Sequence, residues 1–327
     1  MMSVQTSVSP PSTGRPLLKW AGGKRQLLPA LRGYYPRTFN RYIEPFFGSG
    51  AVFFDLHASD RLGGRPARLV DDNVDLISCY RMLMTRADEV IAELRQLAAG
   101  HDRGGSDFYY EIRDARFNPL RAASGPYTPE MAAMLIYLNR TGFNGLFRLN
   151  KAGEFNVPAG RYTNPRILDE DHLRQVASAL RSRGVELVHG SFDEALIDAG
   201  DGDFIYCDPP YAPVSRTACF ANYTAKGFRL DDQERLQQAL IDAANRGALV
   251  ILSNSSAPDI ERLYSTREAR RARLRIERVD ARRSINSRAD SRGPVTELVI
   301  TNVVRPRMLR AGDPYQLAAA GTRKRQA

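Results

Sequence analysis

The sequence is poor in the residues that build metal centres and disulfide frameworks. It has 327 residues, of which 3 are cysteines and 4 are histidines. Cys79, Cys207 and Cys219 are odd in number and lack the close spacing of metal ligands, and no two histidines have the His-x-x-x-His spacing. We therefore expect neither a disulfide framework nor a bound metal.

Long apolar stretches are also missing. No run approaches the roughly 20 residues that cross a bilayer. Residues 1–13 lack both the basic start and the apolar segment of a secretory signal. We therefore expect a soluble protein of the cytoplasm with no membrane partner. The Ser-, Pro- and Thr-rich residues 1–14 predict a flexible leader, and residues 309–327 predict a basic flexible tail.

Acidic residues are outnumbered by basic ones. The chain has 47 Lys and Arg against 37 Asp and Glu, which gives a formal net charge of +10. The 43% hydrophobic content is ordinary for a globular protein. An arginine-rich excess favours a polyanionic partner, because the guanidinium fork matches phosphate and guanine. Charge alone fits nucleic acid and an anionic membrane equally.

The stretch from residue 203 to 211, Asp-Phe-Ile-Tyr-Cys-Asp-Pro-Pro-Tyr, carries the strongest chemical signal. Its apolar residues predict a buried strand with Asp208 at the carboxyl end, where ligands bind in open α/β sheets. Two prolines fix the following turn and remove two backbone donors. A carboxylate, rigid carbonyls and the Tyr211 ring then suit a planar base that bears an amino group. The alternative interpretation is an ordinary proline turn after a strand.

Two glycine segments lie upstream. Residues 41–54 predict a strand, a turn through Gly48 and the start of a helix, as in a nucleotide-binding βαβ unit. A lone G-x-G is a weak motif, but a second strand ends at Asp71, where a carboxylate can bind the ribose of an adenosine. Asp72 would instead cap the next helix. The only tryptophan, Trp20, stands before Gly-Gly and Lys24, so it is either a core anchor or part of a ligand site.

Helices and strands alternate along the chain. Apolar spacing predicts helices over residues 76–99, 129–139, 168–180 and 230–244, and a glycine-containing loop over 101–106. Strands are predicted over 185–188, 204–206 and 249–254, with a closing pair over 275–279 and 297–304, so the class is α/β with a parallel sheet. In residues 140–162, Gly, Asn and Arg alternate with aromatics. This pattern predicts a hairpin or a long structured loop, which is either a surface that reads base edges or merely solvated.

Taken together, these motifs resemble those of the Dam-type N6-adenine DNA methyltransferases, the D12 class with the alpha motif order. The similarity covers residues 15–305 and keeps the motif order of the family. The motifs are Lys-Trp-Ala-Gly-Gly-Lys, Glu-Pro-Phe-Phe-Gly-Ser-Gly, Asp-x-Asn-x-Asp-Leu, Asn-Arg-x-Gly-x-Asn-Gly-Leu-x-Arg, Gly-Glu-Phe-Asn-Val-Pro and Tyr-Cys-Asp-Pro-Pro-Tyr.

The resemblance implies a Rossmann-like methyltransferase fold that uses S-adenosylmethionine. The catalytic domain would comprise residues 15–72 and 169–308, with a mainly helical target-recognition domain inserted over 73–168. The implied reaction is methyl transfer to N6 of adenine in double-stranded DNA by base flipping, performed by a monomer without a metal. Because Arg148 and Arg161 match the family's DNA contacts, the implied target is GATC or a closely related site.

The resemblance also implies roles for individual residues. The cofactor-binding residues would be Trp20, Lys24, Phe46, Gly48, Asp71, Phe192 and Asp208. The catalytic residues would be Asp208, Pro209 and Tyr211. The DNA contacts would be Lys19, Phe143, Asn144, Leu146, Arg148, Pro158, Arg161 and Tyr162.

Two positions depart from the family pattern. Phe143 replaces a tyrosine of the close relatives, so the aromatic face is kept and the hydroxyl is lost. Ser191 precedes Phe192 where relatives often carry an acidic residue, which makes Asp193 a candidate for holding the adenine amino group of the cofactor.

Other reactions fit the residues less well. A C5-cytosine methyltransferase needs a cysteine nucleophile, and its Pro-Cys pair is absent from the sequence. N4-cytosine enzymes carry Ser where Asp208 stands. A methyltransferase acting on another nucleic acid or site, and a catalytically inert DNA-binding relative, remain as alternatives.

Overall fold

The structure is a computed structural model that describes residues 14–20, 22–123, 125–212, 227–282 and 294–304. Most of the predicted leader, all of the predicted tail, and Cys219 lie outside the described residues. None of the helices in the described ranges combines the length and the hydropathy needed to cross a membrane.

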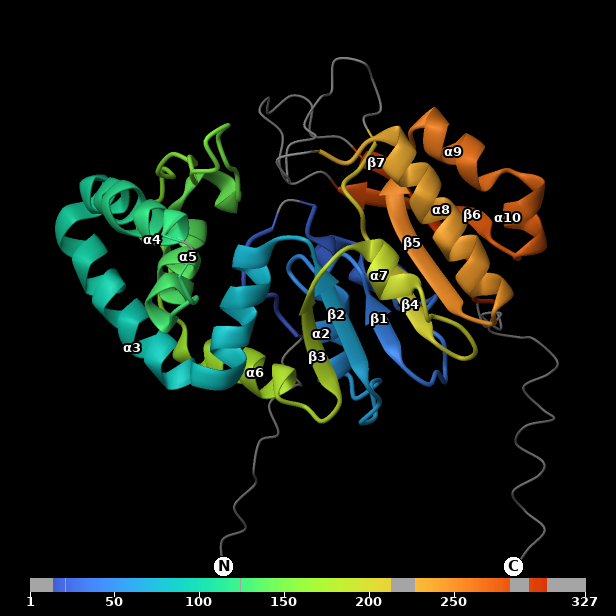
Figure 1. The fold of residues 1–327 in the computed structure, drawn as a ribbon, viewed down its shortest axis with the longest axis horizontal. Coiled ribbons are helices and arrows are strands. Elements are labelled where there is room, and N and C mark those ends of the chain that lie inside the picture. Colours follow the sequence, from blue (N-terminus) through green and yellow to red (C-terminus); the bar gives the residue numbers. More distant parts are fainter. Residues whose placement is uncertain (1–13, 21, 124, 213–226, 283–293, 305–327) are drawn as a thin grey trace, which may run out of the picture.

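A seven-stranded sheet forms the centre of the molecule, with the strand order β3-β2-β1-β4-β5-β7-β6 (Figure 1). Neighbours among β1 to β5 pair in parallel, while β7 pairs antiparallel with both β5 and β6. The predicted α/β class with a parallel sheet and a closing pair of strands is therefore confirmed. The strands are β1 (Tyr42–Glu44), β2 (Ala67–Asp71), β3 (Val185–His189), β4 (Phe204–Cys207), β5 (Leu249–Ser255), β6 (Arg275–Arg282) and β7 (Pro294–Thr301).

Strand β4 lies at the middle of this sheet and is buried on both faces. Phe204 and Tyr206 pack into one hydrophobic core, and Ile205 and Cys207 pack into the other. This alternation explains why the strand is a continuous apolar run. The first core is formed with α2 (Ala51–Ala58) and α6 (Glu170–Leu180), and the second with α7 (Phe192–Leu196), α8 (Leu230–Asn245) and α9 (Pro258–Tyr264).

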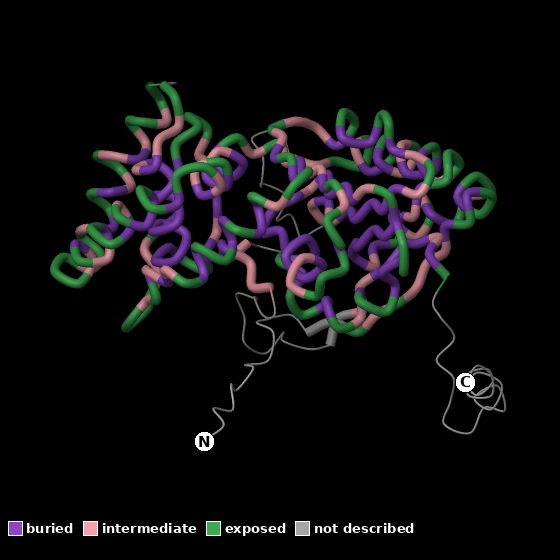
Figure 2. Tube along the Cα trace, turned by 90° about the horizontal axis from the view of Figure 1, so that it is seen from below, coloured by how far each residue is buried: buried purple, intermediate pink, exposed green. Residues whose placement is uncertain are grey.

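A helical lobe stands beside the sheet, on the left of Figure 1. It contains α3 (Val74–Tyr110), the π-helical turn η2 (Glu111–Phe117), α4 (Asn118–Ala122) and α5 (Pro129–Thr141). The side chain of Asn73 caps α3 by accepting a hydrogen bond from the Leu76 amide at 3.1 Å, so the cap is Asn73 rather than Asp72. Figure 2 shows that the inner turns of the lobe are buried, and its apolar side chains continue the first core of the sheet.

The loop predicted over residues 101–106 is wrong. Helix α3 continues through this segment to Tyr110, with non-helical backbone at Arg86 and Gly105. Gly104 packs closely, because a Cβ there would lie 2.9 Å from the Phe108 side chain, whereas Gly105 has a positive φ of 53° and kinks the helix. The segment also docks on α5, where His101 Nδ1 lies 2.9 Å from the Tyr137 hydroxyl.

Residues 142–162 form a long structured loop after α5. It starts with the short helix η3 (Phe143–Gly145) and is closed by two isolated antiparallel bridges, Gly142 with Ala159 and Leu149 with Phe155. The predicted hairpin or structured loop is therefore confirmed. The remaining elements are η1 (Lys24–Gln26), α1 (Leu28–Leu31) and α10 (Arg267–Arg271).

An ion pair between α3 and α4 predicts a large stability effect. Arg121 makes a forked contact with Asp75, with N–O distances of 2.8 to 3.0 Å, and their side chains are only 13% and 7% exposed. Arg121→Leu should lower the free energy of unfolding by about 3–5 kcal/mol, because it leaves a buried carboxylate unpaired. The measurement is urea denaturation.

The matched control for this variant is Arg116→Leu. Arg116 pairs with Glu130, but both side chains are about 40% exposed, and exposed pairs contribute only about 0–1 kcal/mol. Equal losses for the two variants would contradict a special role for the buried pair.

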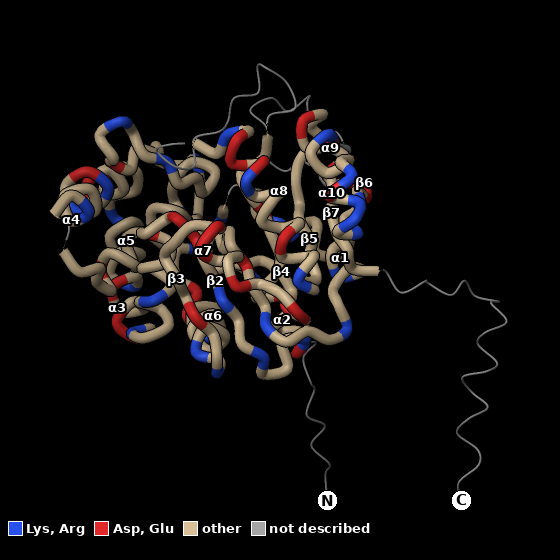
Figure 3. The backbone as a smooth tube through the Cα atoms, turned by 45° about the vertical axis from the view of Figure 1, so that its right-hand side comes forward, with Lys and Arg blue, Asp and Glu red and all other residues tan. Residues whose placement is uncertain are grey.

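Basic and acidic residues are interspersed over the molecule, as Figure 3 shows. Many arginines pair with acids from neighbouring elements, for example Arg174 with Asp88 and Arg278 with Glu261. Within the described ranges, the net positive charge is therefore not gathered on one face that would identify a DNA-binding surface.

Candidate active site

Three carboxylates meet at one edge of the sheet. Glu44 is the last residue of β1, Asp71 is the last residue of β2, and Asp208 directly follows β4. These strands are parallel neighbours, so their carboxyl ends lie together, which is where ligands bind in open α/β sheets. Glu44 is buried and accepts a hydrogen bond from the Tyr42 hydroxyl at 2.8 Å. Burial raises the pKa of Glu44 well above its usual range.

Asp208 is paired with Lys24. The Lys24 Nζ lies 2.8 Å from Asp208 Oδ1 and also donates a hydrogen bond to the Gly22 carbonyl at 2.6 Å. The lysine is only 5% exposed. Burial raises the pKa of Asp208 to about 6, and Lys24 opposes this rise. Asp208 is therefore mainly ionised at pH 7, with a buried ammonium beside it.

The turn after Asp208 is held by side chains from two elements, α8 and β5. The Pro210 carbonyl accepts a hydrogen bond from Gln233 Nε2 at 3.0 Å, and the Ala212 carbonyl accepts one from Ser255 Oγ at 2.7 Å. No residue in the described ranges donates a hydrogen bond to the Pro209 carbonyl. The Pro209 carbonyl, next to Asp208 in the chain, therefore keeps its capacity to accept a hydrogen bond.

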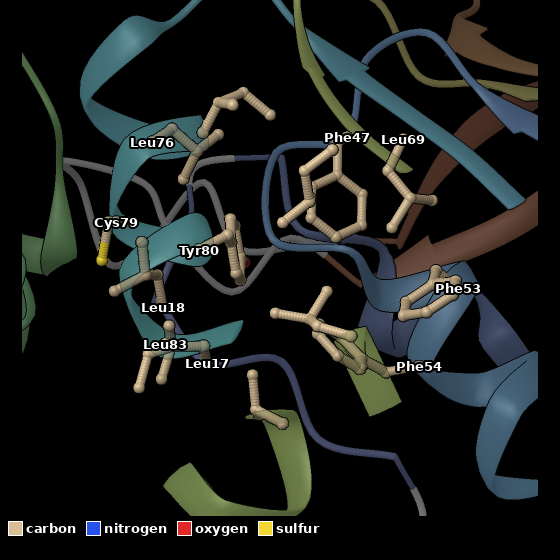
Figure 4. Close-up of a cluster of buried hydrophobic side chains, with 14 of the residues drawn as sticks. Leu17, Leu18, Phe47, Phe53, Phe54, Leu69, Leu76, Cys79, Tyr80 and Leu83 are labelled. Carbon is tan, nitrogen blue, oxygen red and sulfur yellow. The ribbon is translucent and has the colours of Figure 1, made fainter. Parts of the chain in front are cut away.

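Residues of the first core hold the glycine turn at Gly48 in place. Phe47 packs on Tyr80 at 4.9 Å between ring centroids, and the Tyr80 hydroxyl donates to the Gly48 carbonyl at 3.2 Å (Figure 4). Gly48 has a φ of +48°, and a Cβ there would lie 3.1 Å from the Trp20 ring. This position therefore requires glycine because the indole passes directly over it.

Asp71 ties the glycine turn to β2. Its Oδ2 accepts from the Gly48 amide at 2.8 Å, and its Oδ1 accepts from the Asn73 amide at 3.0 Å. Burial raises the pKa of Asp71 to about 7, and the two amides oppose this rise. Each oxygen keeps a second lone pair that can accept another hydrogen bond.

Three phenylalanines form an aromatic cluster near this turn. Phe46 stacks on Phe192 with ring centroids 5.6 Å apart, and Phe228 contacts both rings edge-on. Ser191 caps α7 in a reciprocal capping box with Glu194. Asp193 pairs with Arg235 at 3.4 Å and has a 47% exposed side chain.

The predicted DNA-contact residues lie on the loop after α5 and beside it. Asn139 joins the two parts: its Oδ1 accepts from the Lys19 amide at 2.9 Å, and its Nδ2 donates to the Lys19 carbonyl at 2.7 Å and to the Gly145 carbonyl at 2.9 Å. The Lys19 ammonium lies 4.2 Å from the centre of the Tyr162 ring. Phe143 and Tyr162 are exposed large hydrophobic residues, 48% and 38% respectively.

The rest of this set lies on the same loop. Arg148 Nε donates to Asn156 Oδ1 at 2.8 Å, and Arg148 Nη2 donates to the Asn156 carbonyl at 3.1 Å. The Pro158 carbonyl accepts from the Phe143 amide at 2.9 Å. Asn144 has a positive φ of 54°, Leu146 is partly buried, and Arg161 is exposed.

The loop and the sheet edge are adjacent. Trp20 stacks on Phe147 at 5.8 Å, so a predicted cofactor residue touches the loop that carries the predicted DNA residues. Several residues that shape this region were missed by the sequence interpretation, namely Glu44, Asn139, Gln233, Ser255 and Glu297. Two of them carry a local signal: Glu44 opens the Glu-Pro-Phe-Phe-Gly-Ser-Gly segment, and Asn139 opens the Asn-Arg-x-Gly-x-Asn-Gly-Leu-x-Arg segment.

Comparison with known proteins decides the family. The profile described as "D12 class N6 adenine-specific DNA methyltransferase" matches residues 20–285, which is most of the chain. The chain belongs to this family. It is therefore an adenine-specific DNA methyltransferase that uses S-adenosylmethionine, and the predicted reaction class and cofactor are confirmed.

Relatives of this D12 methyltransferase align along most of its length. A Type II methyltransferase of Lactococcus lactis subsp. cremoris is 38% identical over 293 residues, covering 88% of this chain and 95% of its own. A Type II methyltransferase of Methanocaldococcus jannaschii is 37% identical, covering 88% and 99%. The DNA adenine methylase of Escherichia coli is 35% identical, covering 87% and 94%.

The geometry of the D12 site suits its methyl donor. In the described ranges, no three or more His, Cys, Asp or Glu side chains lie together in a way that could hold a metal ion. The site offers a glycine turn, an acidic group at the end of β2, and aromatic rings. These are the features that bind an adenosine-containing cofactor at the carboxyl edge of a doubly wound sheet.

Proposed function

We propose that this methyltransferase modifies N6 of an adenine that it flips out of duplex DNA, within GATC or a closely related site. The observation that supports this most directly is the pair of acceptors at the end of β4, the Asp208 carboxylate and the Pro209 carbonyl. Support for the site comes from Arg148 and Arg161, which match the family's DNA contacts. We further propose that the enzyme acts as a monomer in the cytoplasm.

The two acceptors would activate a weak nucleophile. The N6 lone pair is delocalised into the adenine ring. Acceptance of both N6 hydrogens by Asp208 and Pro209 would draw the nitrogen toward a tetrahedral geometry and point its lone pair at the methyl group. Each charge-assisted hydrogen bond contributes about 1.5–3 kcal/mol, whereas ideal alignment of the reacting atoms contributes up to about 7–11 kcal/mol. Positioning therefore dominates over base catalysis.

Cofactor binding would use the residues around the glycine turn. S-adenosylmethionine supplies the methyl group from its sulfonium and leaves as a neutral thioether. The ribose would be held by the free lone pairs of Asp71, and the adenine by the aromatic cluster. The residues that we assign to the cofactor are Trp20, Lys24, Phe46, Gly48, Asp71, Phe192 and Asp208.

Target recognition would fall to the helical lobe and its loop, residues 73–168. Phe143 is exposed and rigidly placed by the short helix η3, which suits a wedge between base pairs. Tyr211 would stack on the extruded adenine and offset part of the flipping cost by about 1–3 kcal/mol. The remaining proposed contacts come from Lys19, Asn144, Leu146, Arg148, Pro158, Arg161 and Tyr162.

Arg148 provides a direct test of base reading. Its guanidinium is oriented by two contacts to Asn156 and is otherwise exposed. Arg148→Ala should lower the discrimination between cognate and altered sites by roughly 1–3 kcal/mol. The measurement is the ratio of methylation rates on the two duplexes. Lys151→Ala, an exposed charge on the same loop, is the control, and an unchanged ratio in Arg148→Ala would show that Arg148 reads no base.

The function is tested by expression in a host that lacks adenine methylation, followed by sequencing that maps modified adenines. We expect N6-methyladenine at one short motif, and none in cells that express Asp208→Ala. Modification at a motif other than GATC would correct the site and keep the reaction. Absence of modified DNA together with DNA binding would indicate an inert relative.

A further inference from the structure

Tyr211 is anchored to a strand that the proposed chemistry does not use. Its hydroxyl donates a hydrogen bond to Glu297 Oε2 at 2.6 Å, and Glu297 lies on β7, 86 residues further along the chain. Burial raises the pKa of Tyr211, so the phenol keeps its proton and remains a donor. Glu297 pairs in register with Ser255 of β5 and Val279 of β6, so its backbone is fixed from both sides.

One face of the Tyr211 ring is already covered. The Lys24 ammonium lies 4.3 Å from the ring centre and 2.8 Å from Asp208 Oδ1. The ring therefore connects Glu297, through its hydroxyl, with the Lys24–Asp208 pair, through its face. A base that stacks on Tyr211 must take the opposite face.

From these contacts we propose that Glu297 is a positioning residue of the methyl-transfer site. Its carboxylate fixes the phenol, and so holds the ring between Lys24 on one face and the extruded adenine on the other. The inference deepens the proposed function, because it assigns a residue that sets where the flipped base stacks. Nothing in the local sequence around Glu297 indicates this role.

The charge of Glu297 also acts on Asp208. The groups that influence the Asp208 carboxylate are Lys24, which lowers its pKa, and Glu297, which raises it. Buried Glu44 on β1, together with Tyr206 and Tyr211, faces the same carboxylate. Loss of the Glu297 charge should lower the pKa of Asp208, so that the carboxylate stays ionised at lower pH. A purely structural residue would leave this titration in place.

The test compares Glu297→Gln, Glu297→Leu and Tyr211→Phe in single-turnover methylation of duplex DNA. Glu297→Gln keeps an acceptor for the phenol, so its rate at neutral pH should stay within a few-fold of the wild type, while the acid limb of its pH–rate profile moves to lower pH. Glu297→Leu and Tyr211→Phe each lose the hydrogen bond and should be slower by about tenfold, with little change in the KM for DNA. The double variant, Glu297→Leu with Tyr211→Phe, should be no slower than the slower of the two single variants, because both lose the same hydrogen bond.

Glu277→Gln is the matched control, since it removes the same charge from the neighbouring strand β6, where the carboxylate pairs with Arg275. Its pH profile should not move. An unchanged acid limb in Glu297→Gln, or multiplied losses in the double variant, would overturn the proposal. Glu297→Gln keeps the size of the side chain, so a failure of Glu297→Leu to fold leaves the pH test intact. An inactive wild type in the same assay would instead refute the proposed function.

Discussion

Replacement of Asp208 by alanine should reduce methyl transfer by about 10³-fold, since a preorganised group that acts on the reacting atoms is worth about 10²–10³ in rate and its loss also misaligns N6. Asp208 follows the central strand β4 and is the only one of the three edge carboxylates that pairs with a lysine in the described residues. The measurement is single-turnover incorporation of methyl groups into duplex DNA.

DNA binding provides the internal control for this variant. Among the described residues, Asp208 forms its ion pair with Lys24 and none with residues 142–162, so the affinity for duplex DNA should remain within a few-fold of the wild type. Asp259→Ala, which removes a partly exposed acid from α9, should leave both quantities unchanged. An Asp208→Ala enzyme that still transfers methyl groups would contradict the proposed mechanism.

Replacement of Lys24 by methionine should have the second largest effect, a loss of activity at pH 7 of about 10²-fold. Lys24 opposes the burial that raises the pKa of Asp208 to about 6. Without the ammonium, the pKa of Asp208 rises further, so more of the carboxyl is protonated at neutral pH and its acceptor strength falls. The acid limb of the pH–rate profile should therefore move to higher pH.

A pH series separates this explanation from simple loss of the cofactor. In the wild type, kcat/KM should fall as the pH drops through about 6, because it reports groups of the free enzyme. In Lys24→Met the fall should begin at higher pH, and alkaline buffer should restore part of the rate. Arg25→Met removes an exposed charge from the next residue and should not move the limb. A uniform loss at every pH would assign Lys24 to cofactor binding alone.

Local patterns sufficed for the strands and for the position of Asp208 at the end of β4. The strand of Phe204, Ile205 and Tyr206 is buried on both faces. Such a strand is a continuous apolar run without alternating polar residues, so its sequence identifies it directly. The turn at Gly48 and the strand end at Asp71 could also be predicted, because a strand, a glycine turn and a helix follow one another within a short segment. The Ser191 cap was predictable in the same way, since Ser-x-x-Glu is a capping box.

Other features depend on partners that are distant in the sequence. Glu297 and Gln233 hold the turn after Asp208, yet each lies on a different element, and no spacing rule joins them to it. The glycines at 104 and 105 predicted a loop because glycine usually weakens a helix. Packing of Gly104 against Phe108 and of His101 against α5 keeps the segment helical, with a kink at Gly105.

The hydrogen bonds that join Lys19 to Asn139 have a consequence for how the enzyme is made. The segment that carries Arg15, Lys19 and Lys24 is synthesised well before its partners, which are Asn139, Asp169 and Asp208, from 120 to more than 150 residues later in the chain. Long-range contacts of this kind form late, because the entropy of loop closure must be overcome first. The methyl-transfer site should therefore be among the last parts of the nascent protein to assemble, after most of the chain has been synthesised.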